Sequence, residues 1–154
     1  MKNERKSEPS PLTAHLGFWM RMVSNQVSET FAKKVEAEGV SVAEWVVLRT
    51  LFGRGGAPSA VAEAVGLSRG QVSKVVDALV RRGLVLRKES GSDRRYQELH
   101  LSPAGEAIVP RLAVLADAND QTHFAALDAA ERRKLLDLLK KVAAAIPSPR
   151  VPTH

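Results

Sequence analysis

Apolar residues recur at intervals of three and four along most of the chain, the spacing that places them on one face of an α-helix. The first such stripe runs from Leu12 to Val35, between Ser10-Pro11, a typical helix start, and Gly39, a typical helix end. It predicts a helix over residues 11–40, about 40 Å long at 1.5 Å per residue. A small domain cannot bury so long a stripe alone. We therefore expect the stripe to continue into a partner subunit; a long core helix within one subunit is the alternative.

Later helix starts are marked by capping boxes, in which a Ser or Asp and a Glu or Gln three residues later each accept a hydrogen bond from an unpaired backbone N–H. Such boxes begin at Ser41, Ser68 and Asp128, and two further helices are predicted to start near Pro58 and at Ser102-Pro103. The pattern thus predicts six helices. In the last one we expect an apolar stripe to face inward as far as Pro147, made of Leu135, Leu136, Leu139, Val142 and Ile146.

Two tandem helices followed by a hairpin are the most informative arrangement in the pattern. One helix is predicted to end at Gly66 and the next to begin at Ser68, and residues 84–89 and 95–101 then predict two short strands. We therefore expect a mainly α fold with a small β-hairpin wing, a winged helix-turn-helix of six helices. In that geometry the second helix enters the DNA major groove while the hairpin reaches the backbone or the minor groove.

Charge supports this interpretation through its position. The chain has a formal net charge of +6, with 23 Lys plus Arg and 17 Asp plus Glu. Eight of the basic residues but only three of the acidic ones lie between Arg69 and Tyr96, so the predicted second helix and wing carry nearly all the excess. Most charge runs are merely solvated, but this one lies on the elements expected to touch a DNA duplex. We therefore expect double-stranded DNA as a partner.

Several classes of protein are excluded or disfavoured by composition. With no Cys, the chain can form no disulfide, thiol nucleophile or thiol redox switch. No apolar run approaches the roughly 20 residues needed to cross a bilayer, and no apolar signal segment follows the first residues, so we expect a soluble, cytoplasmic protein.

An enzyme is also disfavoured, because no catalytic motif is present. The chain has no phosphate-binding glycine loop, no HExxH and no serine elbow. The glycines at 53, 55 and 56 follow a predicted helix rather than a strand, and no Lys-Ser or Lys-Thr pair follows them. We expect no catalytic residues and no cofactor.

Three segments of the chain resemble the MarR (multiple antibiotic resistance regulator) family of bacterial repressors. These segments are Ser68 to Ser73, Leu79 to Val85, and Asp93-Arg94-Arg95 followed by Leu101-Ser102-Pro103-Ala104-Gly105. The resemblance covers about residues 11 to 146. It implies a triangular homodimer held by the first, fifth and sixth helices, with one winged helix per subunit binding a pseudo-palindromic operator.

The expected organisation is one domain of that kind. Residues 1–10 form a flexible arm, 11–40 a dimerisation helix, 41–101 the winged helix-turn-helix region, 102–146 the remaining dimerisation helices, and 147–154 a flexible tail.

Roles on the second helix of the motif follow from side-chain chemistry. Arg69 is suited to a bidentate pair with guanine, and Gln71 or Ser73 to other base edges, although Gln71 is partly occupied by its capping bond. Lys74 and the Ser68 hydroxyl are suited to phosphate, because the N-terminal end of a helix is electropositive.

Roles in the wing are implied by the resemblance alone. The second arginine of the family's wing motif, Arg95 in this sequence, enters the minor groove, and Asp93 orients it. Arg94 is the alternative groove residue.

The resemblance also implies release from DNA by a small aromatic or phenolic acid. His15, Trp19, Trp45 and Arg49 are the candidate residues, because the rings could stack on a planar ligand and the guanidinium could neutralise its carboxylate. The alternative is that these aromatic residues belong to the core. A metal site is not expected, since the histidines are dispersed, although a site assembled across a dimer stays open. Constitutive or nonspecific DNA binding and a protein-interaction role remain the alternative functions.

Overall fold

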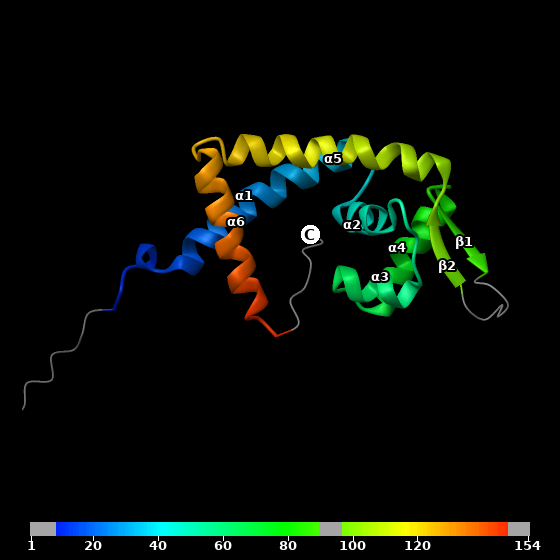
Figure 1. Ribbon diagram of the computed structural model, residues 1–154, viewed down its shortest axis with the longest axis horizontal. Helices are drawn as coiled ribbons and strands as arrows, with labels where there is room; N and C mark the ends of the chain where they lie inside the picture. The colour runs from blue at the N-terminus through cyan, green and yellow to red at the C-terminus, as the bar shows by residue number, and fades with distance from the viewer. Residues whose placement is uncertain (1–8, 90–96, 148–154) are drawn as a thin grey trace, which may run out of the picture.

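The computed structural model describes residues 9–89 and 97–147, and within them it contains six α-helices and one two-stranded antiparallel hairpin (Figure 1). The mainly α fold with a small β-hairpin, predicted from the sequence, is thereby confirmed. In chain order the elements are a 3₁₀ turn Leu12–Ala14, α1 (Leu16–Ala37), α2 (Val42–Leu51), α3 (Pro58–Val65), α4 (Arg69–Arg81), β1 (Val85–Glu89), β2 (Gln97–Leu101), α5 (Pro103–His123) and α6 (Ala129–Ala144).

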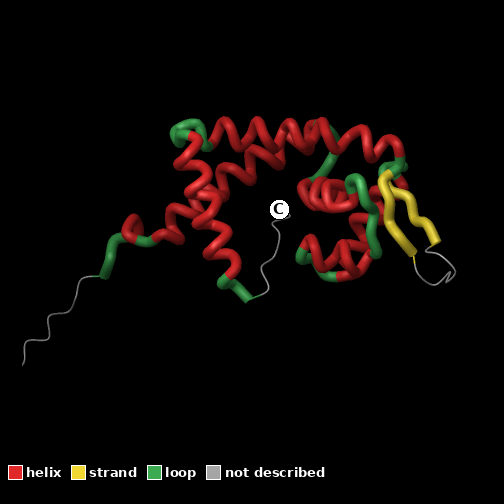
Figure 2. Tube along the Cα trace, in the orientation of Figure 1, coloured by secondary structure: helices red, strands yellow, loops and turns green. Residues whose placement is uncertain are grey.

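The elements gather at two ends of an elongated molecule. In Figure 1, α5 runs along the top from the hairpin to α6, and α1 packs beside it. We call α2, α3, α4, β1 and β2 the winged end, and Figure 2 shows that the strands lie only there within the described residues. We call the N-terminal half of α1, the C-terminal half of α5 and α6 the helical arm.

The hydrophobic core lies in the winged end and where it meets α1 and α5. Its members come from every helix except α6, and from both strands, because each amphipathic element turns its apolar face to the same centre. Among the most deeply buried are Val35, Leu48, Leu51, Val61, Val72, Leu79, Leu99 and Leu112.

The capping boxes predicted from the sequence are confirmed. At α2, Glu44 N–H donates to Ser41 Oγ at 3.1 Å, and Ser41 N–H donates to Glu44 Oε2 at 2.8 Å. Equivalent reciprocal pairs begin α4 and α6. A cap of this kind stabilises a helix by about 1 kcal/mol, so these boxes define where each helix begins.

The glycine loop after α2 has a structural role. Gly56 N–H donates to Leu99 O at 2.9 Å and Leu99 N–H donates to Gly56 O at 2.8 Å, so the loop extends the hairpin sheet beyond β2. A Cβ on Gly55 would lie 2.5 Å from His100 Nδ1, and its φ of +67° also favours glycine. The loop therefore needs its glycine to lie against the wing.

A second close approach joins α5 to the end of α4. Ser102 is buried, and its Oγ accepts from Gly105 N–H at 3.0 Å and donates to Gly83 O at 2.6 Å. A Cβ on Gly105 would lie 2.1 Å from Leu84 O. The Ser-Pro-Ala-Gly sequence at the start of α5 thus lets this helix approach the backbone that leads into the wing.

The predicted start of the first helix is wrong. The helix begins at Leu16, because His15 has an extended backbone with φ −97° and ψ 125°, and only a short 3₁₀ turn precedes it. The carbonyl of Thr13 accepts from the indole Nε1 of Trp19 at 2.9 Å instead of from a helical N–H. Ser10-Pro11 therefore does not cap α1.

The expectation that the apolar stripe of the sixth helix faces inward is also wrong for this chain. No residue of α6 is buried, Leu135 is half-buried, and Val142 is 55% exposed. The other stripe residues, Leu136, Leu139 and Ile146, are exposed as well. The reason is that α6 turns away from the core at the end of α5, so the described chain leaves most of the stripe uncovered (Figure 1).

No helix in the described part of the chain combines the length and apolar character that crossing a bilayer requires.

Candidate nucleic-acid interface

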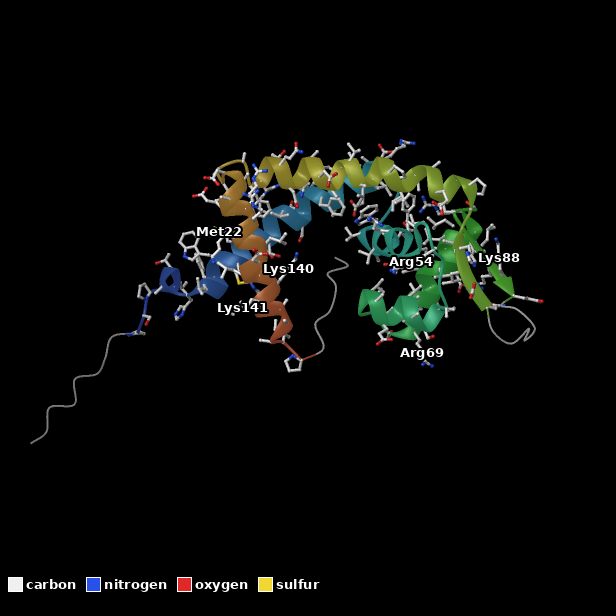
Figure 3. All side chains as sticks on the ribbon, in the orientation of Figure 1. Met22, Arg54, Arg69, Lys88, Lys140 and Lys141 are labelled. Atoms are coloured by element: carbon white, nitrogen blue, oxygen red, sulfur yellow. The ribbon has the colours of Figure 1, made fainter. Side chains whose placement is uncertain are left out.

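Helix α4 separates its apolar and polar residues cleanly. Val72, Val76 and Leu79 are buried in the core, whereas Arg69, Ser73 and Lys74 are exposed. In Figure 3, Arg69 projects from the winged end on the side away from α5. The structure therefore brings the predicted DNA-contacting residues of this helix onto one accessible surface.

The cap of α4 limits what two of these residues can offer. Ser68 Oγ accepts from Gln71 N–H at 3.2 Å, and Gln71 Oε1 accepts from Ser68 N–H at 3.0 Å. Ser68 keeps its hydroxyl hydrogen, and Gln71 keeps its NH₂ group. Both residues can therefore still donate to phosphate or a base, but a bidentate pair between Gln71 and adenine requires its oxygen to be shared with the cap or released from it.

The hairpin lies beside α4 and is held to it by an ion pair. Strands β1 and β2 pair from Val85 with Leu101 to Glu89 with Gln97. The Arg87 guanidinium on β1 bonds the carboxylate of Asp77 on α4. Both side chains are more than a third exposed, so the pair contributes little to stability, but it orients the strand relative to the helix. Lys88 projects from the same strand (Figure 3).

A groove with a volume of about 490 Å³ runs between the helices and the hairpin. Its polar lining comes from four elements: Ser59 on α3, Arg69 and Ser73 on α4, Arg87 on β1 and Gln97 on β2. The sequence indicated Arg69 and Ser73, and it included Arg87 only within the charge excess. Ser59 and Gln97 were missed, because a polar residue at the start of a helix or strand carries no distinguishing signal.

The predicted wing residues lie outside the described part of the chain. Asp93, Arg94 and Arg95 fall between the two described ranges, so their roles stay predictions.

The four candidate effector residues form two separate groups in this chain. His15 and Trp19 lie at the N-terminal end of α1, whereas Trp45 packs edge-on against Phe31 with 6.3 Å between ring centroids. Trp19 and Phe31 are 12 residues apart on one helix, about 18 Å at 1.5 Å per residue. Arg49 lies on α2 over the ring of Phe52, 5.8 Å from its centroid. One protomer therefore does not bring the four residues into a single cavity.

Trp19 does line a hollow in the helical arm. The hollow has a volume of about 620 Å³ and is lined mainly by apolar residues of α1, the turn after α5, and α6. His123 and two serines are its polar members. Its lining also includes Met20, Val23, Val27, Phe124, Leu127, Leu135 and Leu139.

Within residues 9–89 and 97–147, no group of three or more His, Asp or Glu side chains is placed to hold a metal ion.

Comparison with known proteins agrees with this geometry. Residues 38–95 match the model of the MarR family. A putative transcriptional regulatory protein for the hcr operon of Thauera aromatica is 32% identical over 133 residues, which are 85% of this chain and 80% of that protein.

Two solved structures have the same fold. One, from work on the regulation of DNA binding of Bordetella bronchiseptica BpsR by 6-hydroxynicotinic acid, has a TM-score of 0.78 and 26% identity, covering 90% of this chain and 99% of that one. A MarR variant from Escherichia coli complexed with operator DNA has a TM-score of 0.73 and 25% identity, covering 82% and 92%. With its exposed, Arg-led α4 beside the hairpin, this chain belongs to the MarR family and is a DNA-binding transcriptional regulator, not an enzyme.

Proposed function

We propose that the protein is a repressor that binds a pseudo-palindromic operator as a homodimer and is released by a small aromatic acid. The observation that carries the DNA-binding part is the exposed polar surface of α4, with Arg69 at its first position and the groove to the hairpin beside it. Each protomer would place its α4, the recognition helix, in the major groove. A dimer bound at a promoter would then keep the transcription machinery from that promoter and so repress transcription.

The homodimer is supported by the apolar surface of the helical arm. Leu12, Leu16, Met20 and Val23 are exposed near the start of α1, and α6 exposes its stripe beside them. So large an unpaired apolar surface is unusual on a monomer. A second copy presents the same two stripes, so the surface is complementary to itself, as a two-fold interface requires. The N-terminal half of α1 and α6 are the proposed dimerisation elements.

The DNA-binding proposal is tested by selection from a pool of random duplexes with the wild-type protein. We expect an inverted repeat whose half-sites are about 10 base pairs apart, because a two-fold dimer places its two recognition helices one helical turn apart. Arg69→Ala should weaken binding to the selected duplex about 5- to 150-fold, the value of one bidentate base contact, and should relax preference at one base pair. Affinities are measured by fluorescence anisotropy at a fixed salt concentration.

Arg133→Ala is the matched control for Arg69→Ala. This arginine is also exposed, but it lies on α6, in the helical arm. We expect it to leave the affinity for the selected duplex unchanged. Equal losses in the two variants would mean that only the total charge matters, and recovery of no preferred sequence would leave nonspecific DNA binding as the function.

The effector part of the proposal rests on the hollow beside Trp19. A volume of about 620 Å³ lies within the range of small-molecule sites. A second copy seated on α1 and α6 would close its open side. BpsR, whose DNA binding is regulated by 6-hydroxynicotinic acid, supports a planar aromatic acid as the ligand class.

The effector prediction uses the fluorescence of Trp19. In a Trp45→Phe variant, Trp19 is the only tryptophan, and we expect hydroxybenzoic acids or 6-hydroxynicotinic acid to quench it and to displace the selected duplex. In a Trp19→Phe variant the same acids should leave Trp45 emission unchanged while the protein still binds DNA. Quenching in neither variant, with no displacement of DNA, would favour constitutive binding.

A further inference from the structure

The Arg82 side chain, at the C-terminal end of α4, is bonded to a distant part of the chain. Its Nη2 donates to Gly39 O at 2.6 Å, and its Nη1 donates to Glu44 Oε1 at 3.0 Å. Gly39 lies in the turn after α1, and Glu44 is in the first turn of α2. One guanidinium thus fastens the end of the recognition helix to the corner between α1 and α2.

The acceptors at this corner are themselves held in place. Glu44 is only 13% exposed, and its other oxygen, Oε2, accepts from Ser41 N–H in the α2 capping box. The turn after α1 is closed by Gly39 N–H donating to Glu36 O at 2.8 Å and Val40 N–H donating to Val35 O at 3.0 Å. Arg82 therefore bonds to a rigid part of the scaffold rather than to a mobile side chain.

The two residues that follow Arg82 are hydrogen-bonded to the start of α5. The Ser102 hydroxyl donates a hydrogen bond to Gly83 O, and Ser102 N–H donates to Leu84 O at 3.0 Å. The end of α4 is thus bonded to α1 and α2 on one side and to α5 on the other. Both α1 and α5 continue into the helical arm (Figure 1).

We propose that Arg82 is a positioning residue for DNA binding: through Gly39 and Glu44 it sets the orientation of α4 relative to the helical arm, and so the separation of the two recognition helices. The proposal rests on the homodimer proposed above. It assigns Arg82 no contact with DNA, although Arg82 belongs to the basic cluster between Arg69 and Tyr96.

The role of Glu44 separates positioning from direct contact. If Arg82 contacted phosphate, removal of the nearby carboxylate would leave DNA affinity unchanged or raise it, because a negative charge is lost. If Arg82 positions α4, loss of its partner must lower the affinity. Glu44→Gln is suited to this test because glutamine also completes a capping box, so α2 keeps its cap while the ion pair is lost.

The first measurement, amide hydrogen exchange, is independent of both DNA and dimerisation. Arg82→Lys keeps the charge but cannot bond two acceptors with a planar fork. In Arg82→Lys and Glu44→Gln we expect faster exchange at residues 82–84, whose N–H groups bond the last turn of α4, and unchanged exchange in α6. Arg81→Ala, which changes the exposed neighbouring arginine, should leave both segments unchanged. Unchanged exchange at residues 82–84 in both Arg82→Lys and Glu44→Gln overturns the proposal.

The second measurement is the dependence of affinity on half-site separation. The selected duplex is made with its half-sites moved by one or two base pairs in each direction. We expect Arg82→Lys and Glu44→Gln each to lower the affinity for the duplex with the best half-site separation about tenfold, as for loss of a charge-assisted hydrogen bond. Affinity for the duplexes with other separations should fall much less. The double variant should lose no more affinity than either single variant, because the two residues act as one unit.

Other outcomes overturn the proposal. A salt slope reduced by about 0.9 in Arg82→Ala, with Glu44→Gln binding as tightly as wild type, would make Arg82 a phosphate contact. Equal losses at every separation, together with a lower melting temperature, would make the bonds merely structural. If wild-type protein selects no inverted repeat, the homodimeric operator proposal fails, and the exchange measurement still decides whether Arg82 holds α4.

Discussion

Replacement of Gly105 by alanine should cost about 3 kcal/mol of stability, at the upper end of the usual range for overpacking. The new Cβ would lie 2.1 Å from Leu84 O, and that oxygen cannot move freely because it accepts Ser102 N–H. The first turn of α5 must therefore shift away from the end of α4. In a chain of this size the change corresponds to a fall in melting temperature of about 10 °C. Calorimetry or thermal circular dichroism at one fixed protein concentration measures it.

Gly70→Ala is the matched control for this prediction. Gly70 is also a helical glycine, but a Cβ there would meet no atom within 4 Å. Alanine has the higher helix propensity, so we expect the control to be unchanged or more stable by up to about 1 kcal/mol. A Gly105→Ala protein that melts with the wild type would show that the junction between α4 and α5 is looser than its geometry indicates.

Introduction of a charge on the α6 stripe should abolish the proposed dimer. Val142 is 55% exposed in the protomer, so Val142→Glu leaves the core intact. In a two-fold interface the substitution places two carboxylates in an apolar surface, and an unpaired buried charge costs several kcal/mol. We expect the dimer dissociation constant to rise at least about 100-fold. Sedimentation velocity over a concentration series measures this constant.

Lys141→Glu is the control, because Lys141 is exposed and lies at least about 100° around α6 from every residue of the stripe, and its substitution changes the net charge by more than Val142→Glu does. Lys141→Glu should sediment as the wild type does, and both variants should keep the wild-type circular dichroism spectrum. A Val142→Glu protein with the wild-type sedimentation profile would exclude α6 from the interface.

Local signals in the sequence determined every helix start but the first, the hairpin and the recognition helix. The boxes at Ser41, Ser68 and Asp128 act within four residues, so no distant contact was needed to predict them. The apolar face of α4 and the charge excess from Arg69 onward likewise follow from spacing alone. The start of α1 was mispredicted because Ser10-Pro11 and His15 offer competing local conformations, and the Trp19 indole bond to Thr13 favours the later start.

Only the tertiary structure decided what the polar groups bond and which apolar residues remain uncovered. The stripe of α6 has the same periodicity as a core helix, and spacing cannot show that the helix turns away from the core. The four effector candidates could not be assigned to separate places until α1 and α2 were positioned. Arg82 is one of the eight basic residues of the charge excess, and nothing in the sequence indicates that it bonds Gly39, 43 positions away. Contacts between distant residues depend on how the elements pack, and helix or strand periodicity carries no information about that.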